Sequence, residues 1–290
     1  MEKILQAVGD LSNEEEVIQN YERFKAQQNP WQFAVIKVGG GLIHDAYQRA
    51  QVAKDLVALY EAGLYPTVIH GAGPQLDVRF TELAIETPKF DGVRVTPKSA
   101  QEALVNTVTK TGITLKDEVV ALGGAATYIL PHDGVLRATL SDPDNLASVE
   151  ELDVYTKPII QAIKSQLVPI IGSVGLSGGY CPLLGKKFNA ANVNADTATR
   201  AIAAKLAVNK CILLTESGGV LDANQQLIST LSVEEAEYKI LTGEINGGMI
   251  PKVKEALCLK AQGIESVAIT SPLNLLVELF TDEGKGTLIK

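Results

Sequence analysis

Two lysines that stand far apart in the sequence each lie beside a glycine turn. Lys37 ends a short apolar run and precedes Gly39 and Gly40, and Lys252 follows the glycine pair at 247–248. Free backbone N–H groups at such turns bind anions, and a nearby ammonium adds positive charge. A cation in the first turn of a helix is unfavourable, so Lys252 indicates an anionic partner. For Lys37, a plain turn with a solvated lysine is an equally good interpretation of the residues alone.

A second glycine segment, HGAGPQ, occupies 70–75 and follows the apolar run 67–70. It half resembles the dinucleotide fingerprint GxGxxG, but Leu76 stands where the third glycine belongs, which makes a Rossmann interpretation weak. The sequence contains no GxxxxGK[ST] phosphate loop. Phosphate binding therefore requires another architecture.

Polar side chains with fixed geometry occur in two further segments. Arg94 lies between valines in GVRVTP, and its planar fork suits a ligand carboxylate, although a surface salt bridge is the commoner fate of a lone arginine. Asn192, Asn194 and Asp196 alternate in NVNAD, just before a helical run. Helix capping explains one of these three easily and all three less easily. A polar turn at 215–222, TESGGVLD, follows the apolar run 210–215, at the usual ligand position in open α/β sheets.

The surrounding pattern predicts the elements that position these residues. Short apolar runs rich in β-branched residues indicate strands at 33–38, 67–70, 126–130, 168–174, 210–215 and 266–270. Helical patterns lie between several of them, at 46–62, 99–108, 158–166, 195–207 and 250–261. This alternation predicts an α/β fold, a three-layer α/β/α sandwich with a mainly parallel central sheet.

An N-terminal helical extension is expected over residues 1–30, with Ser12 and Glu15 forming a capping box. Its apolar faces could pack on their own domain or on another subunit, and the sequence does not favour either. The Gly-rich and basic stretch 175–189 indicates a boundary between an N-lobe, 31–188, and a C-lobe, 189–290.

Composition excludes several classes of protein. The 290 residues carry 26 basic and 34 acidic side chains, a net charge of −8, with 46% hydrophobic residues. A folded core is expected, and the absence of a basic excess disfavours nucleic acid as a partner. No apolar run is long enough to cross a membrane. The acidic N-terminus resembles neither a secretory signal nor a transit peptide, so a soluble, cytoplasmic protein is expected. The histidines and cysteines show no metal-ligand spacing.

Taken in order, these segments resemble the amino acid kinase family, and within it the acetylglutamate kinases. The resemblance covers residues 33–290 and rests on KVGGG, HGAGPQ, GVRVTP, NVNAD, LTESGGVLD, INGGMIPK and GTLI. The N-terminal extension and Ala72 resemble the yeast- and Xanthomonas-like branch, in which an acetyltransferase domain often follows the kinase. The chain ends at Lys290, so the kinase domain alone is expected.

The resemblance implies a role for each matching residue. Lys37 and Lys252 would bind the transferring phosphoryl group and Asp196 would organise them. The acceptor, N-acetyl-L-glutamate, would contact Gly71, Ala72, Gly73, Arg94, Asn192 and Asn194. ATP with Mg²⁺ would contact Gly39, Gly40, Thr215, Glu216, Ser217, Gly218, Gly219, Leu221 and Asn246, and no residue would serve as a metal ligand. Ala72 and Glu216 depart from the family pattern, which often has glycine and aspartate there.

The implied activity is transfer of the ATP γ-phosphoryl group to the γ-carboxylate of the acceptor in arginine biosynthesis. The resemblance also implies a homo-oligomer with arginine as an effector. The alternative is a catalytically silent module that senses arginine or scaffolds a partner. Retention of Lys37, Asp196 and Lys252 favours the enzyme. A dinucleotide-dependent oxidoreductase is disfavoured by the missing third glycine.

Overall fold

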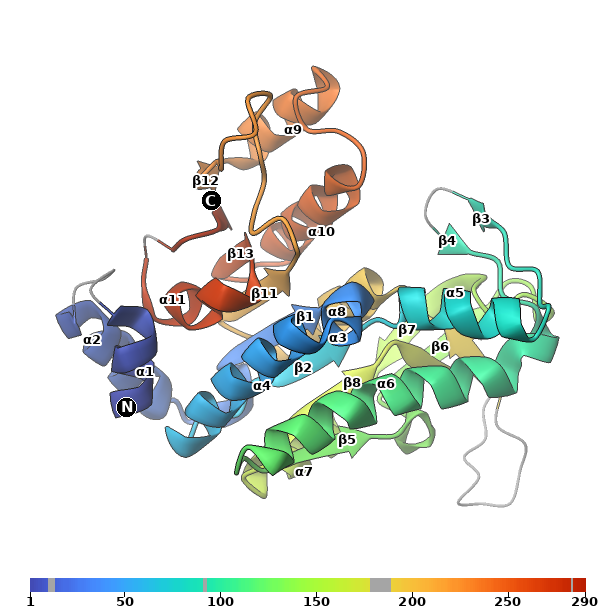
Figure 1. Ribbon diagram of the computed structural model, residues 1–290, viewed down its shortest axis with the longest axis horizontal. Helices are drawn as coiled ribbons and strands as arrows, with labels where there is room; N and C mark the ends of the chain where they lie inside the picture. The colour runs from blue at the N-terminus through green and yellow to red at the C-terminus, as the bar shows by residue number, and fades with distance from the viewer. Residues whose placement is uncertain (10–13, 91–92, 178–188, 283) are drawn as a thin grey trace.

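A large, mainly parallel sheet runs through the centre of the computed structural model, which describes residues 1–9, 14–90, 93–177, 189–282 and 284–290 (Figure 1). Its strand order is β12-β14-β13-β11-β1-β2-β8-β5, and β13 with β14 is the one antiparallel pair described within this sheet. The bounds are β1 (Ala34–Val38), β2 (Thr67–His70), β5 (Ala126–Ile129), β8 (Val168–Gly172), β11 (Lys210–Leu214), β12 (Thr230–Leu231), β13 (Ser266–Thr270) and β14 (Thr287–Ile289).

Helices cover both faces of this sheet and bury a separate core on each. Alternate residues of β1 point to opposite faces, so Ile36 packs with one group of helices and Val35 with the other. The first face carries α1 (Glu2–Val8), α2 (Glu14–Lys25), α3 (Gly40–His44), α4 (Ala46–Glu61), α6 (Gln101–Ala121) and α11 (Leu275–Phe280). The second carries α7 (Lys157–Lys164), α8 (Ala195–Leu206), α9 (Val233–Leu241) and α10 (Met249–Ala261). The predicted α/β/α sandwich is confirmed.

A smaller sheet and a hairpin lie beside the main sheet and were not predicted. The smaller sheet has the order β10-β9-β6-β7, and the hairpin pairs β3 with β4. Their bounds are β3 (Lys89–Phe90), β4 (Val93–Arg94), β6 (Leu136–Leu140), β7 (Val149–Val154), β9 (Val174–Ser177) and β10 (Asn189–Asn192). Helix α5 (Gly73–Glu82) packs with α6 and β9 around a third core. Short 3₁₀ segments occupy Pro30–Gln32, Lys98–Ala100, Pro131–Asp133 and Pro272–Asn274.

The sequence pattern predicted a helix over 99–108, and the structure shows that this helix, α6, continues to Ala121. Gly112 interrupts the pattern there, since glycine is a poor helix former. Its presence has a packing reason: a Cβ at Gly112 would stand 2.1 Å from Tyr128 Cε2 and 2.4 Å from His70 Nε2. The glycine lets α6 approach β2 and β5 closely.

The N-terminal helices pack on their own chain. Ile4, Val17 and Phe24 are buried against the first core, and the Phe24 ring lies 4.9 Å from Phe33 and 6.1 Å from Phe280. These apolar residues therefore pack on the parent domain, and a contact of the extension with another subunit stays a prediction. The predicted capping residue, Ser12, lies outside the described residues.

The proposed lobe boundary at 188 also lies outside the described residues, so the division stays a prediction. Strand β1 pairs with β2 on one side and with β11 on the other, which makes the main sheet continuous across both segments. Within the described chain, no helix has the length and apolarity that a bilayer span demands.

Candidate active site

Two glycine turns meet at the carboxyl edge of the central strands. Gly39 and Gly40 follow β1, and Gly71 to Gly73 follow the neighbouring parallel strand β2. The Gly71 amide donates to the Val38 carbonyl at 3.2 Å, which ties the turns together. A Cβ on Gly40 would stand 2.9 Å from the Gly73 nitrogen. Glycine is required at 40 because two backbones touch there.

Lys37 points from β1 toward the start of α8. It shares a strand face with Val35, which packs in the core that contains α8. Its ammonium lies 2.7 Å from the carboxylate of Asp196, in the first turn of that helix, and its side chain is 11% exposed. A lysine this enclosed keeps a fixed position, unlike the solvated lysine of the alternative interpretation.

The start of α8 separates the three polar residues of NVNAD into different roles. Asn194 is the N-cap, because its side-chain oxygen accepts from the Asp196 amide at 2.7 Å. Asn192 instead donates to the Thr96 hydroxyl at 2.8 Å. Capping thus accounts for Asn194, and leaves the Asp196 carboxylate free to pair with Lys37.

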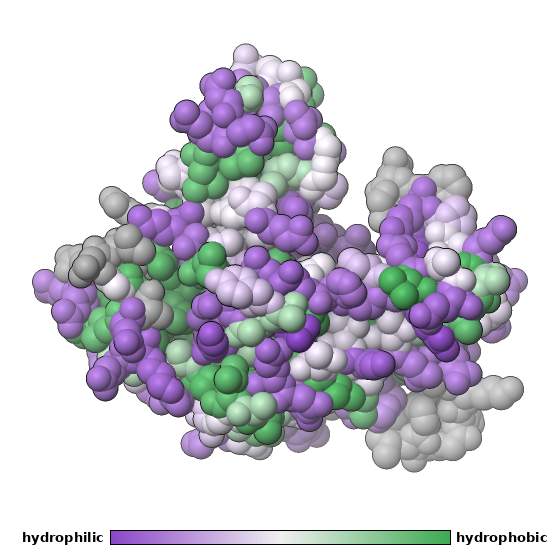
Figure 2. Space-filling model, viewed as in Figure 1, coloured by the Kyte–Doolittle hydropathy of each residue, from purple (hydrophilic) through white to green (hydrophobic). Residues whose placement is uncertain are grey.

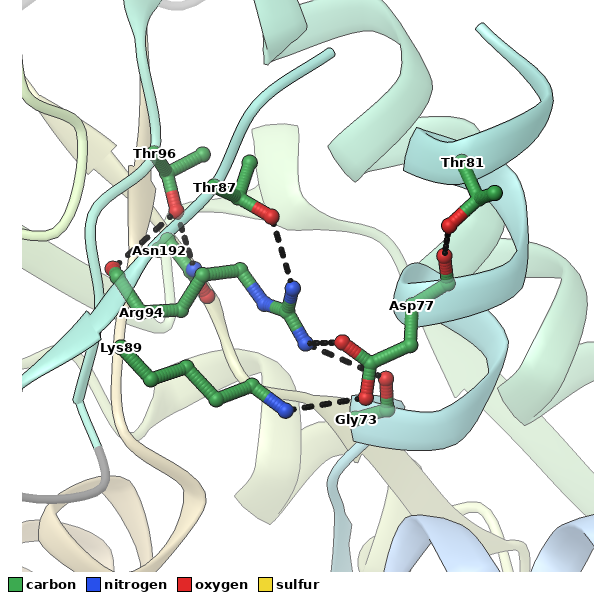
Figure 3. A network of polar contacts seen from close by, with 8 residues as sticks. All are labelled: Gly73, Asp77, Thr81, Thr87, Lys89, Arg94, Thr96 and Asn192. Carbon is green, nitrogen blue, oxygen red and sulfur yellow. Dashed lines mark hydrogen bonds and ion pairs between the residues drawn. The ribbon is translucent and has the colours of Figure 1, made fainter. Parts of the chain in front are cut away.

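Arg94 lies in a polar network between the hairpin and α5 (Figure 3). Its guanidinium donates to the Thr87 hydroxyl at 2.8 Å and pairs with Asp77, and it lies 5.5 Å from the centre of the Phe80 ring. Lys89 donates to the other oxygen of Asp77 at 2.9 Å. Burial alone would raise the pKa of Asp77, but the hydrogen bonds from Lys89 and Arg94 outweigh it and lower that pKa. Two cations therefore share one carboxylate.

These groups line one cavity of about 470 Å³. The sequence-predicted residues on its wall are Lys37, Gly39, Gly40, Gly71, Ala72, Gly73, Arg94, Asn192, Asn194 and Asp196. Lys89 and Ser173 also line it and were not predicted. The lysine–aspartate pair and the Arg94 network both face this cavity, so a ligand there would meet cations from two directions.

Lys252 lies in the first turn of α10 and does not line this cavity. Burial and the charge of Lys37 lower its pKa, whereas Asp196 and Glu216 act to raise it. These influences place Lys252 near the lysine–aspartate pair. In the described part of the chain, the ion pair formed by Asp196 is with Lys37, and Lys252 has no carboxylate within ion-pair distance. An arriving anion would therefore meet an unneutralised ammonium.

The residues assigned to the nucleotide fall into two groups. Leu221 and Asn246 line a second cavity of about 300 Å³, together with Asp222 and Glu244. The segment 215–219 does not line it. There Thr215 and Ser217 hydrogen bond to each other at 3.1 Å, and Gly218 and Gly219 adopt φ of 75° and 154°, which favours glycine.

The two departures from the family pattern have different consequences. Ala72 has a φ of −141°, so this position needs no glycine conformation. Glu216 Oε1 lies 2.6 Å from where a Cβ on Gly41 would stand. The longer side chain thus reaches back to the first glycine turn instead of the second cavity.

Besides Ser173, the polar site residues that sequence reasoning missed are Lys89 and Asp77. Lys89 faces Arg94 across the hairpin register, and Asp77 lies one turn after Gly73 on α5. Strands of two residues have no periodicity to detect. The one available indication was the position of Asp77 four residues after the second glycine of HGAGPQ.

Comparison with known proteins gives the same family from a family model and from individual relatives. A model of the amino acid kinase family matches residues 32–271. Acetylglutamate kinase from Methylobacterium nodulans is 34% identical over 280 residues, which cover 89% of this chain and 88% of that protein. The enzyme of the same name from Rhodospirillum rubrum is 33% identical, over 88% of this chain and 86% of its own.

Solved structures share the fold. The crystal structure of smu.665 from Streptococcus mutans has a TM-score of 0.72 at 25% identity, covering 89% of this chain and 98% of that one. N-acetylglutamate synthase from Neisseria gonorrhoeae has a TM-score of 0.75 at 20% identity, covering 96% of this chain and 63% of its own. At that identity the second likeness concerns the fold alone.

Gly40→Ala should destabilise the protein, because the new methyl would strike the backbone of the second glycine turn. We expect a loss of about 1–3 kcal/mol in the free energy of unfolding, measured by urea denaturation. Gly73→Ala is the matched control, since a Cβ there meets nothing within 4 Å. The control should be neutral or more stable by about 0.4–1 kcal/mol. Equal stability of the two variants would contradict the contact between the turns.

Proposed function

Since the chain belongs to the amino acid kinase family, and within it to the acetylglutamate kinases, we propose that it transfers the γ-phosphoryl group of ATP to the γ-carboxylate of N-acetyl-L-glutamate. The observation that carries the proposal is the enclosed Lys37–Asp196 pair, which stands beside two touching glycine turns on the wall of one cavity. The product would be an acyl phosphate, formed within arginine biosynthesis.

The chemistry requires positive charge more than a base. A γ-carboxylate is ionised at neutral pH and is already a nucleophile. What opposes the reaction is repulsion between that carboxylate and the phosphoryl oxygens. Fixed cations and backbone amides reduce this repulsion most when charge spreads over the phosphoryl group in the transition state. Lys37 and Lys252 supply the cations, and the turns after β1 and β2 supply the amides.

The acceptor would be oriented by the Arg94 network. Asp77 carries one negative charge, whereas Arg94 and Lys89 carry two positive charges between them. The surplus charge faces the cavity and suits the α-carboxylate of the acceptor. Asn192 lies on the same wall and would hydrogen bond the acetamide. The γ-carboxylate would then point toward Lys37 and the glycine turns.

The nucleotide would lie between Lys252 and the second cavity, where Leu221 and Asn246 are found. Mg²⁺ neutralises phosphate charge when it is bound. No group of three or more His, Cys, Asp or Glu side chains in the described residues could hold a metal ion. Mg²⁺ at nucleotide sites is usually held by the phosphates and water with one or two carboxylates, so the ion would bind together with ATP.

We also propose that the protein is a homo-oligomer. Large apolar side chains are exposed on α5 and α6, among them Val78 at 55% and Val120 at 48%. Figure 2 shows hydrophobic patches over these helices within a mostly hydrophilic surface. Such patches are typical of subunit contacts. A cytoplasmic location and an arginine effector are proposed on the family resemblance.

The acceptor is tested by coupled ADP release with N-acetyl-L-glutamate, L-glutamate and L-aspartate. We expect turnover with the first and little with the other two, because only the acetylated amine lacks the positive charge that Arg94 and Lys89 would repel. Faster turnover with an unacetylated amino acid would contradict the proposed acceptor. Binding of arginine without any turnover would favour the silent module instead.

Lys37→Met, Lys252→Met and Asp196→Asn should each lower kcat more than they raise the KM for ATP. The physical reason is that their charges act most strongly on the transition state, and a loss of roughly a hundredfold is expected. Lys254→Met is the matched control, because Lys254 lies on the same helix as Lys252 and is exposed. Near-normal kcat in a folded Lys37 or Lys252 variant would refute the mechanism.

Arg94→Met and Lys89→Met should raise the KM for the acceptor by about tenfold, since each removes a charge-assisted contact. The KM for ATP should change much less. Arg79→Met serves as the control, because its exposed side chain pairs with Glu82 away from the cavity. An equal rise in both KM values would mean that Arg94 and Lys89 maintain the fold and do not contact the acceptor.

A further inference from the structure

An ion pair outside the cavity connects α8 to α10. The Arg200 guanidinium lies 3.2 Å from Glu255 Oε2, and the Glu255 side chain is only 8% exposed. Neither residue lines the cavity of Lys37 and Asp196 or the second cavity. The pair lies between two helices that pack together on the second face of the central sheet.

The spacing of this pair relates it to the reacting groups. Arg200 stands four residues after Asp196 on α8, and Glu255 stands three residues after Lys252 on α10. Residues three or four apart lie on the same side of a helix, one turn from each other. The ion pair therefore lies one helical turn from Asp196 along α8 and one turn from Lys252 along α10, in each case toward the carboxyl end of the helix.

Burial of Glu255 has a cost that packing alone does not explain. Its other oxygen, Oε1, is buried without a hydrogen-bond partner in the described part of the molecule. Burial raises the pKa of Glu255 to about 7, although Arg200 opposes this effect. An apolar side chain in the same place would avoid the cost. A costly pair between two helices is best explained by the position it imposes on them.

We propose that the Arg200–Glu255 ion pair is a clamp that holds Lys252 at a set distance from the Lys37–Asp196 pair. This inference rests on the function proposed above. Arg200 and Glu255 are then positioning residues, which act on the transferring phosphoryl group through Asp196 and Lys252. The pair supplies the tie between α8 and α10 that Asp196 and Lys252 do not form with each other.

The strength of the clamp depends on pH because Glu255 can be protonated. The charged or titratable groups that face Glu255 are Arg200 and Asp196 from α8, Lys37 from β1 and Cys211 from β11. Glu255 attracts Arg200 only when it is ionised, so protonation as the pH falls through about 7 releases the clamp. Turnover should then decline on the acid side. Ionisation itself costs stability as the pH rises from 4.5 toward about 7, because folding raises this pKa.

Glu255→Gln separates the attraction of Arg200 from the stability cost of ionising Glu255. It keeps the shape of the side chain and removes its charge. We expect kcat to fall by roughly tenfold at about pH 8, with both KM values nearly unchanged, since a small displacement of a reacting group has this effect. The Tm should be unchanged or higher. The decline in kcat toward about pH 6 that we expect of the wild type should be absent from the variant. Arg200→Met should reproduce the loss of kcat, and Arg200→Lys should restore part of it.

Lys205→Met is the matched control, because Lys205 lies on α8 and forms an exposed ion pair with Asp153. It should leave kcat and its pH profile unchanged. Normal kcat in folded Glu255→Gln would overturn the clamp. So would a fall in kcat accompanied by a fall in Tm and a rise in both KM values, which indicates a structural role.

A second measurement does not depend on turnover. Amide hydrogen exchange in α10, residues 249–261, should be faster in Glu255→Gln than in Lys205→Met. If wild type turns over no acceptor, the proposed function fails, and hydrogen exchange still decides whether the clamp exists. Equal exchange in the two variants would overturn it.

Discussion

The ion pair between Lys37 and Asp196 is the interaction on which the rest of the site depends. It joins a central strand to the first turn of α8 at 2.7 Å, with both side chains mostly enclosed. A strand end, two glycine turns and a helix start must all meet for this pair to form. Two local features bring these segments together. Gly40 lets the first glycine turn touch the second, and Asn194 caps the start of α8.

The distribution of positive charge in the protein follows from the same arrangement. The chain carries a net charge of −8, yet its proposed ligands are anions. Positive charge is therefore concentrated at the site: Lys37, Arg94 and Lys89 line the cavity, and Lys252 lies outside its wall in the first turn of α10. Carboxylates hold three of these cations in place, because Asp196 pairs with Lys37 and Asp77 pairs with both Arg94 and Lys89. Asp77 contacts two cations at once, and Lys252 has no carboxylate within ion-pair distance among the described residues.

The sequence predicted the central strands, the glycine turns and most of the cavity wall, because buried parallel strands are continuous apolar runs and glycine turns follow them. It could not predict the hairpin, since β3 and β4 are only two residues long each. Asp77 and Lys89 were missed for that reason: their partner Arg94 reaches them only through tertiary structure. The role of Asn194 was also hidden, because a capping and a ligand-binding asparagine look alike in a sequence.

The two lysines of the proposed mechanism, Lys37 and Lys252, have supports of different rigidity, and this difference follows from chain topology. Lys37 lies on β1, which is hydrogen bonded to β2 and β11, so its backbone is fixed on both sides. Lys252 follows Gly247, which adopts a φ of 54°, and Gly248, which has open space around its Cβ position. Glycine restricts the backbone less than other residues do, so a glycine pair before a helix restrains its first turn less than a strand restrains Lys37. Preorganised charge is effective only when it stays in place during the reaction. A contact further along α10 would therefore help to keep Lys252 in the place that the proposed mechanism requires, and the packing of α10 against α8 provides the surface for one.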